Sequence, residues 1–130
     1  MNGRRLLRES ILPYLPALGW AVALIVLGGV PNLRAPHSSL PLDKVAHFLL
    51  YGTLGALAAW GWRRAGQWPS LAIVLALALG VGVLDEIHQL GVAGRTGDAR
   101  DWLADAAGIL IFAALVRAGG RTRDGANSSG

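Results

Sequence analysis

The stretch LAIVLALALGVGVLDEIHQL, residues 71–90, decides the fold. Residues 71–84 hold no charged side chain, whereas Asp85, Glu86, His88 and Gln89 follow directly. A helix built from residues 71–84 has no polar stripe to present to water, so it is typical of a helix that lies in lipid. The charged residues at its end then lie near one surface of the membrane.

Three other apolar runs resemble this one, and charge is scarce in all of them. They are Ile11–Val30, Val45–Trp62 and Trp102–Val116. The chain is 53% apolar and 15% charged, whereas a soluble domain carries about 25% charged residues. Because a membrane-spanning helix needs about 20 mainly apolar residues, we predict an all-α membrane protein, a compact bundle of four transmembrane helices. Residues 1–118 form this domain, and the Gly-, Ser- and Arg-rich residues 119–130 are predicted to be a disordered cytoplasmic tail.

The basic residues predict which ends of the helices face the cytoplasm. Eight of the twelve belong to the N-terminal arm, the turn between the second and third runs, and the C-terminal tail, and four belong to the other two connections. The larger set is Arg4, Arg5, Arg8, Arg63, Arg64, Arg117, Arg121 and Arg123, and the smaller set is Arg34, Lys44, Arg95 and Arg100. Cytoplasmic connections are enriched in basic residues, so we expect both termini in the cytoplasm. Because these arginines lie at helix ends, the net charge of +4 does not indicate a nucleic-acid partner.

With this orientation, three polar clusters from separate parts of the chain meet at the outer surface. They lie at the start of the second run, the end of the third and the start of the fourth. Residues 31–42 and 91–100 are the predicted external loops, since they are rich in proline, serine or glycine. We expect convergence of Asp43, His47, Glu86, Gln89, Arg95 and Asp101.

His47 and Glu86 are the candidate catalytic residues. His47 lies about one turn inside an apolar run, where ionisable groups are expensive and usually face the protein interior. Glu86 lies beside the third run, and the two side chains could act as an acid/base pair. Asp43 and Tyr51 share the helical stripe of His47, but they are also explained as a helix cap and an interfacial tyrosine.

The segment GRTGDARDWLAD, residues 94–105, has two interpretations. In one, arginine neutralises the carboxylates and Asp101 starts the fourth helix. In the other, Arg95 grips a phosphate or carboxylate through its planar guanidinium, and Asp98 and Asp101 orient it. In both, Asp98, Asp101 and Asp105 can line one face of the fourth helix.

The sequence gives little support for a metal site. EIHQ, residues 86–89, lacks the second histidine of the H-E-x-x-H zinc motif, and the chain has no cysteine. His47, Glu86 and Asp105 could meet around an ion, but this signal is weak, so we predict no metal ligand. No cofactor is identified.

Small residues within the runs predict where helices pack closely, because they let backbones approach in lipid. They are Gly52, Gly55 and Ala59 in the second run, Ala76, Gly80 and Gly82 in the third, and Ala104, Ala107 and Gly108 in the fourth.

Two segments, DKVAHFLLYGTLG (43–55) and LDEIHQLGVAGRTGDARDWLADAAGI (84–109), resemble the VanZ-like family of small bacterial membrane proteins. The shared motifs are a D-K-x-x-H-F helix start, an E-x-x-Q helix end and a G-R-[ST]-x-D-x-x-D loop, within about residues 40–116. The resemblance implies that the family's polar set is Asp43, Lys44, His47, Glu86, Gln89, Arg95, Asp98 and Asp101. It implies a bacterial cytoplasmic (inner) membrane location and an association with glycopeptide-antibiotic resistance, but no reaction.

These observations favour an outward-facing site for a cell-envelope component, such as a lipid-linked or cell-wall precursor. In this hypothesis Arg95, Gln89 and Lys44 bind the substrate, Asp43, Asp98, Asp101 and Asp105 have orienting or structural roles, and membrane lipids surround the helices. The alternatives are a non-catalytic structural or accessory protein and, less favoured, a proton-coupled transporter. Whether the protein is an enzyme stays open.

Overall fold

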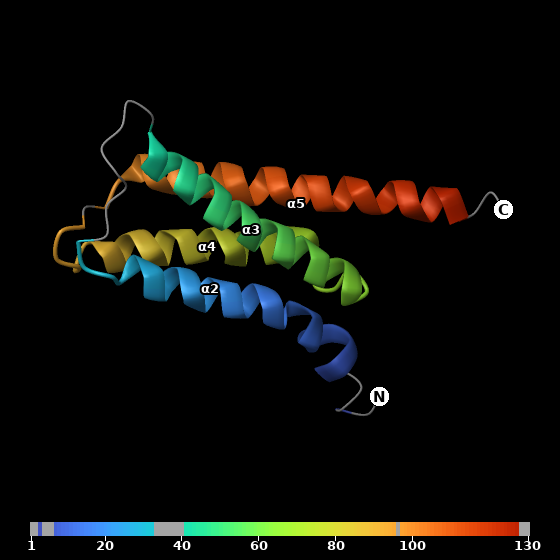
Figure 1. Ribbon diagram of the computed structural model, residues 1–130. Coiled ribbons are helices and arrows are strands. Elements are labelled where there is room, and N and C mark those ends of the chain that lie inside the picture. The colour runs from blue at the N-terminus through green and yellow to red at the C-terminus, as the bar shows by residue number, and fades with distance from the viewer. Residues whose placement is uncertain (1–2, 4–6, 33–40, 96, 128–130) are drawn as a thin grey trace.

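Four long helices make up the computed structural model shown in Figure 1. The structure describes residues 3, 7–32, 41–95 and 97–127, and these contain no strand. The helices are α2 (Leu15–Gly28), α3 (Leu42–Arg64), α4 (Leu71–Gln89) and α5 (Ala99–Asn127), and the short turns η1 (Leu7–Ile11) and η2 (Leu12–Tyr14) lead into α2. The predicted all-α class and the four helices are confirmed.

Successive helices run in opposite directions (Figure 1). The first turns of two helices therefore lie beside the last turns of the other two at each end of the bundle. One end holds the last turns of α2 and α4 and the first turns of α3 and α5; we call it the polar end. The backbone N–H of Asn32, just after α2, donates to the carbonyl of Ala93 in the α4–α5 loop at 3.0 Å. Residues 33–40 of the predicted external loop 31–42 lie outside the described residues.

Three segments are long and apolar enough to cross a membrane: Arg8–Gly28, Leu71–Gln89 and Ala99–Gly120. Their outward surfaces are apolar along the length of the bundle, and Val22, Leu77 and Leu115 are each more than 60% exposed. Large apolar surface of this extent is tolerated in lipid and not in water. The fold is therefore that of a membrane protein.

Helix α3 is long enough to span a bilayer but less apolar than the other three. Its 23 residues extend roughly 35 Å at 1.5 Å per residue. It begins with charged residues, ends with Arg63 and Arg64, and is rich in small side chains between them. The small side chains are explained by its position, because α3 contacts α2, α4 and α5 and packs most extensively on α5.

Glycines form the seam between α3 and α5, as the small residues of those runs predict. A Cβ on Gly55 would meet the backbone of Ile109, and one on Gly108 would meet the carbonyl oxygen of Phe48. The two helix backbones are therefore as close as glycine allows. The prediction of close packing at small residues does not hold at Gly80 of α4, where a Cβ would have no atom within 4 Å.

Helix α5 continues further than the sequence predicts. It ends at Asn127, so residues 119–127 of the predicted disordered tail are helical. No proline interrupts this segment, and adding a residue to an existing helix is far easier than starting one. The prediction of disorder from Gly and Ser content was wrong for these residues, and 128–130 lie outside the described part of the chain.

Candidate functional site

His47 of α3 and Asp105 of α5 form the centre of the polar end. His47 Nδ1 and Asp105 Oδ1 are 2.8 Å apart, and Asp105 is fully buried, with 0% of its surface exposed. Asp105 lies almost one turn before Gly108, so the glycine seam brings the two side chains together. His47 Nε2 also lies 3.8 Å from Asp101 Oδ2, one turn earlier on α5.

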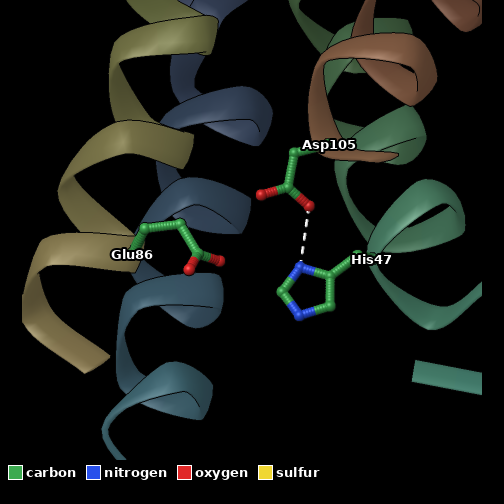
Figure 2. Close-up of side chains that lie close together, drawn as sticks. All are labelled: His47, Glu86 and Asp105. Atoms are coloured by element: carbon green, nitrogen blue, oxygen red, sulfur yellow. Dashed lines mark hydrogen bonds and ion pairs between the residues drawn. The ribbon is translucent and has the colours of Figure 1, made fainter. Parts of the chain in front are cut away.

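Glu86 of α4 completes a cluster of three ionisable groups from three helices. One potential ligand atom from each of His47, Glu86 and Asp105 lies within 4.8 Å of the other two. Figure 2 shows the three side chains pointing toward one shared space. Glu86 is held in place because its Oε2 accepts a hydrogen bond from the backbone N–H of Asp98 at 2.9 Å.

Two carboxylate oxygens of this cluster have no hydrogen-bond partner among the described residues. They are Glu86 Oε1 and Asp105 Oδ2, and both atoms are buried. Leaving a buried polar atom unpaired costs about 1–3 kcal/mol, and more for a charged group. The cluster therefore has unused acceptor capacity directed into the protein.

Lys44 organises the carboxylates closest to the surface. Its Nζ donates to Asp43 Oδ2 at 3.0 Å, to Asp98 Oδ2 at 3.1 Å and to Asp101 Oδ1. The backbone N–H of Arg100 and the Lys44 ammonium together lower the pKa of the exposed Asp98 carboxyl below its ordinary value. These bonds fasten the α4–α5 loop and the start of α5 to the first turn of α3.

A second buried network lies beside the cluster. Its central residue, Asp85, is not among the site residues that the sequence predicts. The Tyr51 hydroxyl donates to Asp85 Oδ2 at 2.8 Å, and Gln89 Nε2 donates to the same oxygen at 3.0 Å. Asp85 is 3% exposed and lies against Gly28 of α2, where any Cβ would meet its Oδ1. The sequence does contain a sign of this network, because Asp85 and Gln89 are four residues apart and therefore lie on one face of the helix.

The rings of His47 and Tyr51 connect the two networks. They lie one turn apart on α3, as their shared stripe predicts, and stack with ring centroids 6.3 Å apart and planes within 2° of parallel. The Tyr51 hydroxyl therefore reaches α4 through Asp85, whereas the His47 imidazole reaches α5 through Asp105.

The structure brings most of the predicted site residues to the polar end. Asp43, Lys44, His47, Glu86, Gln89, Asp98, Asp101 and Asp105 all belong to the contacts described above. Their assigned roles stay predictions, including substrate binding by Lys44 and Gln89, whose side-chain nitrogens contact carboxylates.

Arg95 lies half-buried in the α4–α5 loop, and its backbone N–H donates to Val92 at 3.1 Å. The preceding Gly94 has φ +74°, and a Cβ on Gly94 would meet the side chain of Asn32. Glycine is thus required at the first position of the G-R-[ST]-x-D-x-x-D motif. The predicted grip of Arg95 on an anion stays a prediction.

An apolar cavity occupies the opposite half of the bundle. It has a volume of about 300 Å³ and lies between α2, α3 and α4, lined by residues such as Tyr14, Leu54, Trp68 and Val74. It shares no lining residue with the His47–Glu86–Asp105 cluster. The ionisable groups and the cavity are therefore separate features.

Lipid-type helices around a buried ionisable cluster define a small helical membrane protein with a polar site at one end. The profile of the VanZ/LLP1 family matches residues 9–119, and the chain belongs to this family. The match covers α2, α3, α4 and most of α5, and it confirms the resemblance drawn from the motifs. No curated protein and no solved structure matches the chain.

Proposed function

We propose that the polar end is an outward-facing site that binds or acts on a cell-envelope component, such as a lipid-linked or cell-wall precursor. The observation that supports it best is the meeting of His47, Glu86 and Asp105 from three helices within 4.8 Å. Ionisable groups within membrane-spanning segments are expensive and usually functional.

The proposal includes a membrane arrangement. All four helices cross the bacterial inner membrane, both termini are cytoplasmic, and the polar end faces outward. The excess of basic residues at the opposite end supports this orientation. The parallel directions of α2 and α4 (Figure 1) support this arrangement, with α3 as the segment that crosses back between them.

At such a site the three side chains have separate tasks. His47 and Glu86 exchange a proton with the ligand, and Asp105 orients the imidazole through its 2.8 Å contact. Arg95, in the neighbouring loop, binds an anionic group of the ligand. A phosphate or carboxylate near the headgroups suits this role, because arginine binds both through paired hydrogen bonds.

The structural alternative applies best to the other polar residues. Tyr51, Asp85 and Gln89 bond one another in the interior, and Lys44 ties loop to helix through three carboxylates. An accessory protein without chemistry would use all of these groups as packing. A transporter is less favoured, because the described ionisable cluster lies at one end and the cavity at the other end has an apolar lining.

Paired histidine variants test the proposal. A strain lacking the protein is complemented with the wild type, with His47→Gln, or with His88→Gln. His88 is an exposed imidazole near the same end, so it controls for loss of a histidine. Susceptibility to glycopeptide antibiotics and the pool of lipid-linked cell-wall precursors are measured, together with thermal stability in detergent.

We expect His47→Gln to abolish the effect on the envelope while the protein remains folded, and His88→Gln to behave as wild type. Glu86→Gln should reproduce the result of His47→Gln, because a carboxamide keeps the shape but cannot exchange a proton. Wild-type complementation by stable His47→Gln and Glu86→Gln variants would refute a functional site. Loss of stability in both variants would favour the structural alternative.

A further inference from the structure

We infer that His47, Glu86 and Asp105 bind one divalent transition-metal ion, Zn²⁺ or Mn²⁺, at the polar end of the bundle. The inference does not depend on the identity of the envelope component. It concerns the same side chains as the proposed function: in the metal-free protein His47 and Glu86 exchange a proton with the envelope component, and in the metal-bound protein the three side chains hold the ion.

The spacing of the three side chains suits an ion. Their candidate ligand atoms lie within 4.8 Å of one another. Atoms bound to a tetrahedral ion with bonds of about 2.1 Å lie about 3.4 Å apart. Small side-chain rotations would close the difference between these two separations, because the three side chains already point toward one shared space (Figure 2).

Independent support comes from the unpaired oxygens. Asp105 is fully buried, yet its Oδ2 has no partner among the described residues, and the same is true of Glu86 Oε1. Figure 2 shows both carboxylates directed into the space between α4 and α5. A cation placed there would pair both oxygens at once, which no described side chain does.

The local charges also favour a cation. Glu86, Asp101 and Asp105 surround His47 closely enough to interact with it. The nearby Lys44 ammonium already contacts Asp101 together with two more exposed carboxylates. Like charges at this separation repel strongly when buried, and a divalent ion relieves the repulsion between Glu86 and Asp105 directly.

The donor types select the metal. One imidazole nitrogen and two carboxylates suit Zn²⁺ or Mn²⁺, whereas Mg²⁺ and Ca²⁺ prefer oxygen ligands alone. Three protein ligands leave at least one coordination position open, as in catalytic rather than structural metal sites. That position could receive an anionic group of the ligand, such as a phosphate oxygen.

The test measures metal binding by the purified full-length protein. The protein in detergent is stripped with a chelator, dialysed against ZnCl₂, MnCl₂ or MgCl₂, and its bound metal is counted by mass spectrometry. Binding affinity is measured by calorimetry, and the melting temperature is recorded with and without each ion. The variants are His47→Gln, Glu86→Gln and Asp105→Asn, with His88→Gln as the matched control.

We expect about one Zn²⁺ or Mn²⁺ per chain, weaker binding of Mg²⁺, and a higher melting temperature with bound metal, since a ligand of the folded state stabilises it. Residues that merely orient metal ligands change affinity by about 10–100-fold, so loss of a ligand itself should cost at least about 100-fold. The His88→Gln variant should bind like the wild type.

Two results would overturn the inference. One is the absence of stoichiometric Zn²⁺ or Mn²⁺ in wild-type protein. The other is binding that survives in folded His47→Gln and Glu86→Gln variants, which would indicate an adventitious ion elsewhere. Glu86 is half-buried and Gln keeps its shape, so this variant remains informative if Asp105→Asn does not fold. The assay contains no envelope component, so its failure leaves the complementation test of the proposed function standing.

Discussion

Replacing Gly108 with alanine tests whether the α3–α5 seam holds the site together. A Cβ at this position would meet the Phe48 carbonyl oxygen and lie 2.9 Å from the Gly52 backbone nitrogen. Both are backbone atoms of α3, so neither can rotate away and the helices must separate. Because Asp105 and His47 lie on the same two helices near this contact, their 2.8 Å interaction should lengthen.

The matched control is Gly80→Ala on α4, where a Cβ would have no atom within 4 Å. Both changes gain the same helix propensity, up to about 1 kcal/mol, so comparing them isolates packing. Overpacking a tight contact costs about 1–3 kcal/mol. We expect Gly108→Ala to be less stable than Gly80→Ala by this amount, measured as free energy of unfolding in mixed detergent micelles. Equal stability of the two variants would refute the close seam.

Two further predictions concern the polar networks. Tyr51→Phe removes a hydrogen bond to the buried Asp85 carboxylate and should lower the free energy of unfolding by about 1–3 kcal/mol, with no change expected if that contact is absent. Lys44→Gln should lower the melting temperature most above about pH 5 and least near about pH 3. The hydrogen bonds from Arg100 and Lys44 lower the pKa of the Asp98 carboxyl. The stabilising contact of Asp98 with Lys44 is therefore fully present above the ordinary carboxyl pKa of about 3.9. It is lost as the pH falls through the lowered pKa of the folded protein. A melting-temperature difference independent of pH would contradict this account.

The sequence was sufficient to predict the helices and the polar end, because both depend on patterns along the chain. The charge-free run before Asp85 indicates a helix in lipid, and alternating directions bring the polar ends of three runs together. His47 was singled out because an imidazole inside an apolar run needs a protein partner.

The sequence could not predict how each helix is rotated about its own axis, and therefore which side chains face which neighbouring helix. Asp85 and Glu86 are neighbours, so their side chains point about 100° apart on a helix of 3.6 residues per turn. One joins Tyr51 and Gln89, and the other faces His47. Because α4 is apolar all round, no amphipathic pattern indicates which carboxylate faces which neighbour.

Asp105 shows a second limit. Its position in the fourth run predicts an orienting or structural residue, and nothing local indicates complete burial. Burial follows from the close approach of α3 and α5 at Gly55 and Gly108, a contact between residues more than 50 positions apart in the chain. The length of α5 was likewise misjudged, because composition alone does not show that a helix will continue through glycines.

Cysteine labelling tests the central claim most directly: four helices cross the membrane and place the polar end outside. The chain has no cysteine, so each introduced thiol is the only one. Ala93 lies exposed in the α4–α5 loop, and Ser70 lies exposed before α4 with no side-chain cap hydrogen bond. Ala93→Cys and Ser70→Cys therefore report on opposite ends of the bundle with little disturbance.

In intact cells whose outer surface is accessible, a membrane-impermeant maleimide should label Cys at 93, and it should label Cys at 70 only after permeabilisation. If α3 does not cross, the chain has three spans, and with the N-terminus still inside the pattern reverses, so that position 70 is labelled from outside and position 93 is protected. Labelling of 93 alone supports an outward polar end built from four spans. The reversed pattern would contradict both the topology and the location of the proposed site.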